Sequence, residues 1–119
     1  SSTDAPALAD AGAGPTACAA AYAGCTTFTD LTTMSAAAVA FGTGFNYSPN
    51  CIRVSAGTVV TLPGSGIHPL AQGCGAEDLA VPTAGAAVPF DTVGTYGFHC
   101  MIHGTPAGGG MAMAIEVVP

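Results

Sequence analysis

One short stretch near the C-terminus constrains the fold of this chain more than any other feature. Residues 96 to 111 read Tyr-Gly-Phe-His-Cys-Met-Ile-His-Gly-Thr-Pro-Ala-Gly-Gly-Gly-Met and bring a thiol, an imidazole and a thioether into one loop between two strands. Cys100 and His103 are separated by two residues, so a tight turn can aim both side chains at one point. Met111 follows a glycine-rich segment that can fold back without Cβ clashes. The stretch therefore predicts three ligands of one metal ion.

This set of donors favours copper. Thiolate and thioether ligands are soft, and two His and one Cys in a trigonal plane with a long axial Met form the blue-copper electron-transfer site. Such a site needs a second His from elsewhere in the chain, and the candidate is His68, which follows a Val-rich segment. The predicted metal ligands are His68, Cys100, His103 and Met111.

Two neighbouring residues compete for a place in this site. Met113 is an alternative axial ligand, because Met111 and Met113 are both expected on the inward face of the last strand. The glycines before Met111 and its position at the loop exit favour Met111, with Met113 as packing below the site. His99 points to the opposite face of the strand from Cys100, so we expect an exposed, titrating histidine there and not a ligand.

Other chemistries fit the pattern less well. Structural zinc sites use four Cys or His ligands, and a thioether adds little for zinc. A cysteine hydrolase needs a base and a third group that orients the base, and no such group is visible in the sequence. A copper oxidase would need further ligands for oxygen chemistry, and the chain has only 3 histidines. We therefore expect a protein that is not an enzyme.

The run from Gly94 to His103, followed by Gly110-Met111 and an alternating strand, resembles the plastocyanin-like branch of the cupredoxins. Residues 47 to 62 look like the second and third strands of that family, and the resemblance covers about residues 36 to 119. It implies an all-β fold, a Greek-key β-sandwich, that holds one blue-copper ion. It also implies that the ion cycles between Cu(II) and Cu(I) and shuttles electrons between redox partners.

The same resemblance implies where a partner would bind. A transient redox protein is expected to dock at the exposed edge of His103, ringed by apolar loop residues such as Ile67, Leu70 and Pro106. A small apolar patch is suited to a short-lived encounter. A copper-binding protein for storage or delivery, without redox turnover, is the alternative. The buried thiolate and its aromatic neighbours argue against that alternative without excluding it.

The cysteines predict how the N-terminal part of the chain is held. If Cys100 binds metal, four of the 5 cysteines remain, which fits two disulfides in an oxidising compartment. Strand alternation places Cys51 on an outward face, and this favours Cys25 with Cys51 and Cys18 with Cys74. The local pairing, Cys18 with Cys25 and Cys51 with Cys74, remains open.

The organisation of the chain follows from its composition. Residues 1 to 17 are rich in Ala, Gly and Pro and are expected to form a flexible linker. Residues 18 to 119 form the cupredoxin-like domain, in which residues 18 to 35 are an extension pinned by disulfides. Residues 71 to 87 are expected to be irregular.

Charge and hydropathy limit which partners and which cellular compartment we expect. The formal net charge is -6 and the chain contains a single basic residue, Arg53, so nucleic acid is excluded as a partner. No apolar run is long enough to span a membrane. We expect an exported monomer in the periplasm or another extracytoplasmic compartment, with its export signal removed and the linker as a candidate tether.

Overall fold

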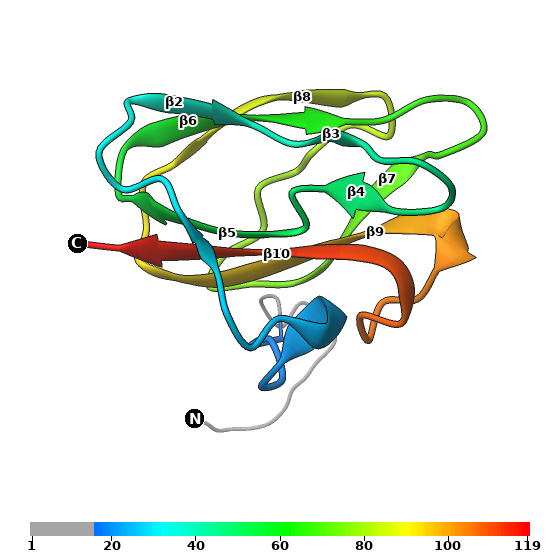
Figure 1. Ribbon diagram of the computed structural model, residues 1–119, viewed down its shortest axis with the longest axis horizontal. Helices are drawn as coiled ribbons and strands as arrows, with labels where there is room; N and C mark the ends of the chain where they lie inside the picture. Colours follow the sequence, from blue (N-terminus) through cyan, green and yellow to red (C-terminus); the bar gives the residue numbers. More distant parts are fainter. Residues whose placement is uncertain (1–15) are drawn as a thin grey trace.

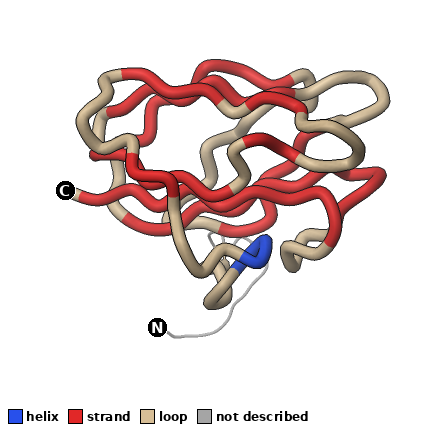
Figure 2. Tube along the Cα trace, in the orientation of Figure 1, coloured by secondary structure: helices blue, strands red, loops and turns tan. Residues whose placement is uncertain are grey.

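The computed structural model describes residues 16–119, so the predicted linker lies outside the described residues except for Thr16 and Ala17. The regular secondary structure of the described chain is almost entirely β, and loops connect its strands (Figures 1 and 2). Its strands are β1 (Thr29–Asp30), β2 (Ala36–Ala38), β3 (Ala40–Phe41), β4 (Tyr47–Ser48), β5 (Cys51–Ser55), β6 (Thr58–Pro63), β7 (Leu70–Cys74), β8 (Gly85–Phe90), β9 (Gly94–Gly104) and β10 (Gly110–Val118). A short 3₁₀ turn, η2 (Tyr22–Gly24), precedes them.

The strands form two mixed sheets and a small ribbon. One sheet has the order β1-β5-β10-β9-β7 and the other the order β2-β6-β8, while β3 and β4 pair with each other. Strand β5 runs parallel to both β1 and β10, and β9 lies antiparallel between β10 and β7. The three-stranded sheet lies above the five-stranded one in Figure 1. The prediction of an all-β chain is therefore confirmed.

One hydrophobic core includes residues of both larger sheets. In β9 the core residues are Tyr96, Phe98 and Cys100, and each is fully buried. The core residues of β10 are Met111, Met113, Ile115 and Val117, in agreement with the predicted inward face. Strand β5 alternates as predicted, with its second and fourth residues buried and Cys51 on the outer side. Period-2 alternation thus identifies the core face of these strands correctly.

The expectation that residues 71 to 87 are irregular is wrong at both ends. Strand β7 pairs with β9, with Leu70 opposite Cys100, and β8 pairs with β6 along its whole length. Both strands contain Gly and Ala where β-branched residues would normally indicate a strand. Their pairing is therefore decided by the neighbouring strands and not by local propensity. The segment between β7 and β8 is irregular as expected.

Two disulfides attach the N-terminal extension to the five-stranded sheet. Cys18 is bonded to Cys74 in β7 and Cys25 to Cys51 in β5, whereas Cys100 is a free, buried thiol. The favoured pairing is confirmed and the local pairing is wrong. The extension lies below this sheet in Figure 1, on the side away from the three-stranded sheet. The part of the chain that the structure describes contains no helix with the length and hydropathy of a membrane span.

Candidate metal centre

Three of the four predicted ligands converge at one end of the β structure. His68 lies in the loop between β6 and β7, and Cys100 and His103 lie near the end of β9. The Nδ1 atoms of the two histidines are 3.2 Å apart. The Cys100 sulfur lies 3.8 Å from Nδ1 of His68 and 3.6 Å from Nδ1 of His103. This cluster can hold a metal ion.

The size of this triangle fits a single transition-metal ion. A point equidistant from three atoms at these separations lies roughly 2 Å from each, close to the metal–nitrogen distance of about 2.0 Å and the metal–sulfur distance of about 2.3 Å found for zinc. Two imidazole nitrogens and one thiolate in a plane around the ion are the trigonal set of a blue-copper site. These distances fit copper and zinc equally.

A large bulge in β9 presents Cys100 and His103 together. Gly104 is paired with Gly110, and the next pair is His99 with Ala112. Residues 100 to 103 of β9 therefore lie opposite a single residue of β10, Met111. A bulge turns the backbone out of the regular pleat and can re-aim its side chains, so two residues three apart in a strand point to one ion. A side chain at Gly104 would collide with the backbone of Met111, which explains the glycine there.

The loop of His68 is fixed to the same strand. The Ser65 hydroxyl accepts a hydrogen bond of 3.1 Å from the His68 backbone N–H, and the Ser65 N–H donates to the His68 carbonyl at 3.1 Å. The Pro69 carbonyl then accepts a hydrogen bond of 2.8 Å from the Met101 N–H. The turn that begins at Ser65 thus fixes the backbone on one side of His68. On the other side, the hydrogen bond from Met101 to Pro69 connects it to the bulge that contains the other two candidate ligands.

Met111, the predicted fourth ligand, lies close to the bulge. It is the residue of β10 opposite the bulge, it is 1% exposed, and it belongs to the same core cluster as Cys100. Met113 is paired with Phe98, farther along the strand from the bulge. This position favours Met111 over Met113 as the fourth ligand.

The cysteine is buried more deeply than the two histidines beside it. Cys100 is fully buried, whereas both histidines are half-buried. Burial raises the pKa of the Tyr47 hydroxyl, and its electrostatic interaction with the nearby Cys100 raises that pKa further. Tyr47 therefore stays neutral beside the site.

Two phenylalanines next to the histidines were not predicted from the sequence. Phe45 stacks on His103 with ring centroids 4.0 Å apart and planes inclined by 8°. Phe41 packs on His68 with centroids 5.2 Å apart. Both come from the β3–β4 hairpin. The signal was present as two aromatic residues separated by a glycine-containing turn, but only the tertiary structure places that hairpin over the ligands.

The structure corrects two expectations about residues around the site. His99 faces away from Cys100 as predicted, but it is buried and not exposed. It lies in the middle of the sheet between Ala71 of β7 and Ala112 of β10, and its Nδ1 is 3.1 Å from the Cys100 carbonyl oxygen. Leu70 is 1% exposed and belongs to the core, so it cannot ring His103 at the surface. Its pairing with Cys100 in the sheet explains this burial.

Exposed apolar side chains gather in the segments that contain or contact the ligands. Ile67 precedes His68, Met101 and Ile102 lie between Cys100 and His103, and the two phenylalanines contact the imidazoles. The exposed members are Phe41, Phe45, Ile67, Met101 and Ile102, which we call the apolar patch. Each of these five side chains is at least 40% exposed.

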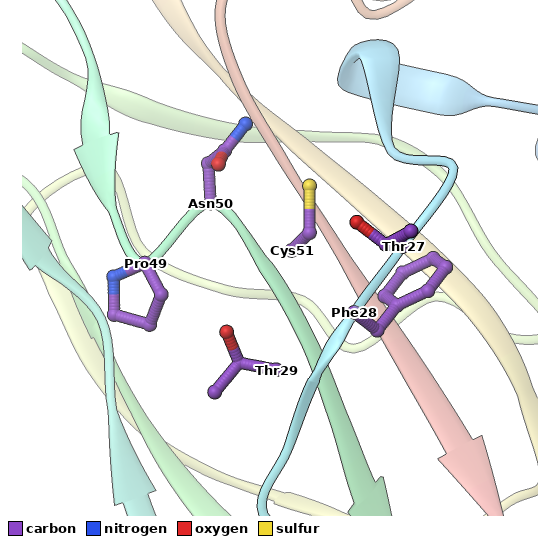
Figure 3. Close-up of a pocket in the computed structure, with 6 residues that line it drawn as sticks. All are labelled: Thr27, Phe28, Thr29, Pro49, Asn50 and Cys51. Atoms are coloured by element: carbon purple, nitrogen blue, oxygen red, sulfur yellow. The ribbon is translucent and has the colours of Figure 1, made fainter.

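A separate pocket lies where the extension runs along β5. Its volume is about 290 Å³, and it is lined by residues 27 to 29 and residues 49 to 51 (Figure 3). Figure 3 shows that its two walls come from the extension and from the start of β5, beside the Cys25–Cys51 disulfide. The pocket shares no residue with the histidine–cysteine cluster. It lies at the contact between the extension and β5 and is not part of the candidate metal centre.

No protein-family model matches this chain, and no curated protein matches it in sequence. The assignment of the centre rests on the donor atoms and their arrangement. His68, Cys100 and His103 are brought together as predicted, Met111 lies opposite them in β10, and the donors present two nitrogens and one thiolate to one point.

Proposed function

We propose that this protein is a cupredoxin-like blue-copper protein that transfers single electrons. The observation that supports this most strongly is the triangle formed by His68, Cys100 and His103, with Met111 opposite the bulge. A buried thiolate and two imidazoles with a thioether nearby are the donors expected for copper in electron transfer. The copper would supply the one-electron chemistry by cycling between Cu(II) and Cu(I).

The β architecture is compatible with the Greek-key sandwich of the cupredoxins. Two sheets share one core, and the strand with the cysteine is flanked on both sides within the five-stranded sheet. The cysteine is thereby attached to the most constrained part of the molecule. A stiff ligand frame keeps one geometry for both oxidation states, and this favours rapid electron transfer.

The apolar patch is the proposed docking surface for the redox partner. Its members Phe41 and Phe45 contact His68 and His103, its other three members are close in sequence to the candidate ligands, and none of the five is charged. Contact through a small uncharged patch supports a transient complex whose rate depends little on salt. An extracytoplasmic, oxidising location is proposed because the two disulfides need it.

The decisive experiment is the visible spectrum of the protein loaded with Cu(II). We expect an intense thiolate-to-copper charge-transfer band in the red that disappears in Cys100→Ser. The other four cysteines are bonded in the Cys18–Cys74 and Cys25–Cys51 disulfides, so the band can arise only from the free thiol of Cys100. Weak d–d absorption alone in the loaded wild-type protein would exclude the blue-copper assignment. Zinc should be removed before loading, because it fits the same triangle.

A second pair of variants tests the axial position. Met111→Leu should retain copper and raise the reduction potential, because loss of a thioether donor destabilises Cu(II) more than Cu(I). Met113→Leu is the matched control, since it makes the same change farther from the bulge. A shift in the potential of the Met113 variant alone would assign the axial ligand to Met113.

The rate of copper release distinguishes an electron carrier from a copper storage or delivery protein. Both histidines are half-buried and reachable from solvent, which a site for metal exchange would require. An electron carrier should keep its copper through repeated oxidation and reduction and should release it slowly to a chelator. Rapid, complete transfer of Cu(I) to a chelator, together with irreversible voltammetry, would favour storage or delivery.

A further inference from the structure

The N-terminal extension inserts one aromatic side chain into a space left open by glycines. Tyr22 is 4% exposed, and its ring lies against three glycines from three separate segments. A Cβ added at Gly97 of β9 would lie 2.6 Å from Cζ of Tyr22, and one at Gly108 would lie 2.9 Å from its Cδ1. A Cβ at Gly73 of β7 would collide with the Tyr22 hydroxyl. The tyrosine and these glycines therefore fit each other closely.

Tyr22 is also bonded to the loop between two of the proposed ligands. Its hydroxyl donates a hydrogen bond of 3.1 Å to the carbonyl of Pro106. Seven residues separate His103 from Met111, and Pro106 lies near their middle. Within the loop, Thr105 and Gly109 exchange hydrogen bonds, and the Gly108 N–H donates to the Thr105 carbonyl at 3.0 Å. Tyr22 thus attaches a closed loop to a distant part of the chain.

The backbone on both sides of Tyr22 has an unfavourable conformation that the surrounding structure must stabilise. Ala21 and Ala23 have φ of 57° and 58°, the left-handed region, and Gly24 follows with φ of 74°. Left-handed backbone is unfavourable for residues with a Cβ and persists where the surrounding structure enforces it. The two disulfides enclose this segment, because Cys18 precedes it and Cys25 follows it.

We propose that Tyr22 is a positioning residue for the metal centre, which fixes the loop between His103 and Met111 through its ring and its hydroxyl. The extension is then more than a cover for the sheet: its disulfides hold Tyr22 in place, and Tyr22 limits how far the loop can open. Opening of this loop would separate Met111 and His103, so Tyr22 slows metal release. The metal part of this inference rests on the proposed function, whereas the effect on the loop does not.

Hydrogen exchange of the metal-free protein tests the effect on the loop directly. Tyr22→Phe keeps the ring and removes the bond to Pro106. The amides of Gly108 and Thr105 should exchange about fivefold faster, the factor that corresponds to a net hydrogen bond of about 1 kcal/mol. Gly73→Ala should act in the same direction, because its methyl group occupies the space between the hydroxyl and the loop.

The matched control is Tyr96→Phe. Tyr96 donates its hydroxyl to the Thr92 carbonyl at 2.7 Å, before the start of β9 and at the opposite end of that strand from the ligands. This variant removes the same kind of bond and should leave exchange of the loop between Thr105 and Gly109 unchanged. If Tyr22→Phe leaves loop exchange at the wild-type rate, or if the control accelerates it equally, Tyr22 is not a positioning residue.

Metal release gives the second measurement. The protein is loaded with Cu(II) or Zn(II) and challenged with excess chelator, and Tyr22→Phe should release either ion about fivefold faster than the wild type and the Tyr96 control, in proportion to the same opening equilibrium. An unchanged release rate for both ions would overturn the role in metal retention. A wild-type protein without the intense Cu(II) band would disprove the blue-copper function, while the metal-free exchange experiment would still decide the role of Tyr22.

Discussion

The two faces of strand β9 are stabilised in different ways. On the inner face Tyr96, Phe98 and Cys100 are fully buried in the core shared by both sheets. On the outer face Gly97 lies against the ring of Tyr22 and the Cys74 sulfur. The inner face is filled by large side chains of the strand itself. The outer face is filled by the extension, which needs two covalent bonds to stay there.

This difference relates each part of the candidate metal centre to a different source of stability. Cys100 belongs to the inner face and inherits the rigidity of the core, whereas the ligand loop is contacted by the extension that covers the outer face. A substitution that removes side-chain volume should destabilise the protein most on the inner face. On the outer face, an added side chain or the loss of a disulfide should destabilise it most. Four predictions test this comparison, and the largest expected effect comes first.

Phe98→Ala removes an inner-face side chain that has no solvent exposure and packs edge-on to Phe90 with ring centroids 6.1 Å apart. The free energy of unfolding should fall by about 4 kcal/mol, because the truncation leaves a cavity in a packed core. Urea denaturation measures the loss. The matched control is Phe45→Ala, which makes the same change at a side chain that is 65% exposed and should cost far less. Equal losses would mean that the inner face is not the main source of stability.

Loss of the Cys18–Cys74 disulfide should have the next largest effect. This bond closes a sequence separation of 56, and its replacement by two alanines should lower the free energy of unfolding by about 3 kcal/mol, because the unfolded chain regains freedom. Removal of Cys25–Cys51, with a separation of 26, should cost less. Denaturation of the two double variants gives the order. The reverse order would show that local packing outweighs loop closure.

Gly97→Ala adds one methyl group to the outer face and should destabilise the protein by about 2 kcal/mol, the usual cost of overpacking. The added Cβ would press on the Tyr22 ring and the Cys74 sulfur, and neither can move freely. The glycine has no left-handed backbone, so a thermal melt reports the steric effect alone. Double substitution with Tyr22→Ala should remove much of the penalty. A penalty that persists in the double variant would point to Cys74 or the sheet as the obstacle.

The same comparison explains how far the sequence predicts this structure. Alternation in β9 and β10 identifies the inner face, and the spacing of Cys100 and His103 predicts that these two side chains converge, because both patterns are local. The outer face has no comparable pattern: β7 was missed because its Ala71 and Gly73 lack strand propensity, and His99 was expected at the surface. Phe45 was missed because a contact between a hairpin and a ligand is decided by tertiary packing.

The smallest predicted effect concerns Arg53, the single basic residue of the chain, on the outer side of β5. Its Nε donates a hydrogen bond of 2.6 Å to Glu116 of β10, and its guanidinium lies 5.5 Å from the ring centre of Phe28 in the extension. The side chains of the ion pair are 39% and 32% exposed, so solvent screens much of their attraction. We expect Arg53 and Glu116 to couple by about 0.5 kcal/mol, as exposed pairs do.

A double-mutant cycle with Arg53→Met and Glu116→Gln measures this coupling, since both substitutions keep most of the side-chain volume. The coupling should shrink when salt is raised to about 1 M, where the screening length is about 3 Å. Arg53→Met should also cost more than Glu116→Gln, because only the arginine faces Phe28. A coupling well above 1 kcal/mol that is insensitive to salt would contradict this prediction. It would mean that the polar contact stabilises the extension on the outer face as much as a buried interaction does. The difference between the two faces would then depend less on the disulfides.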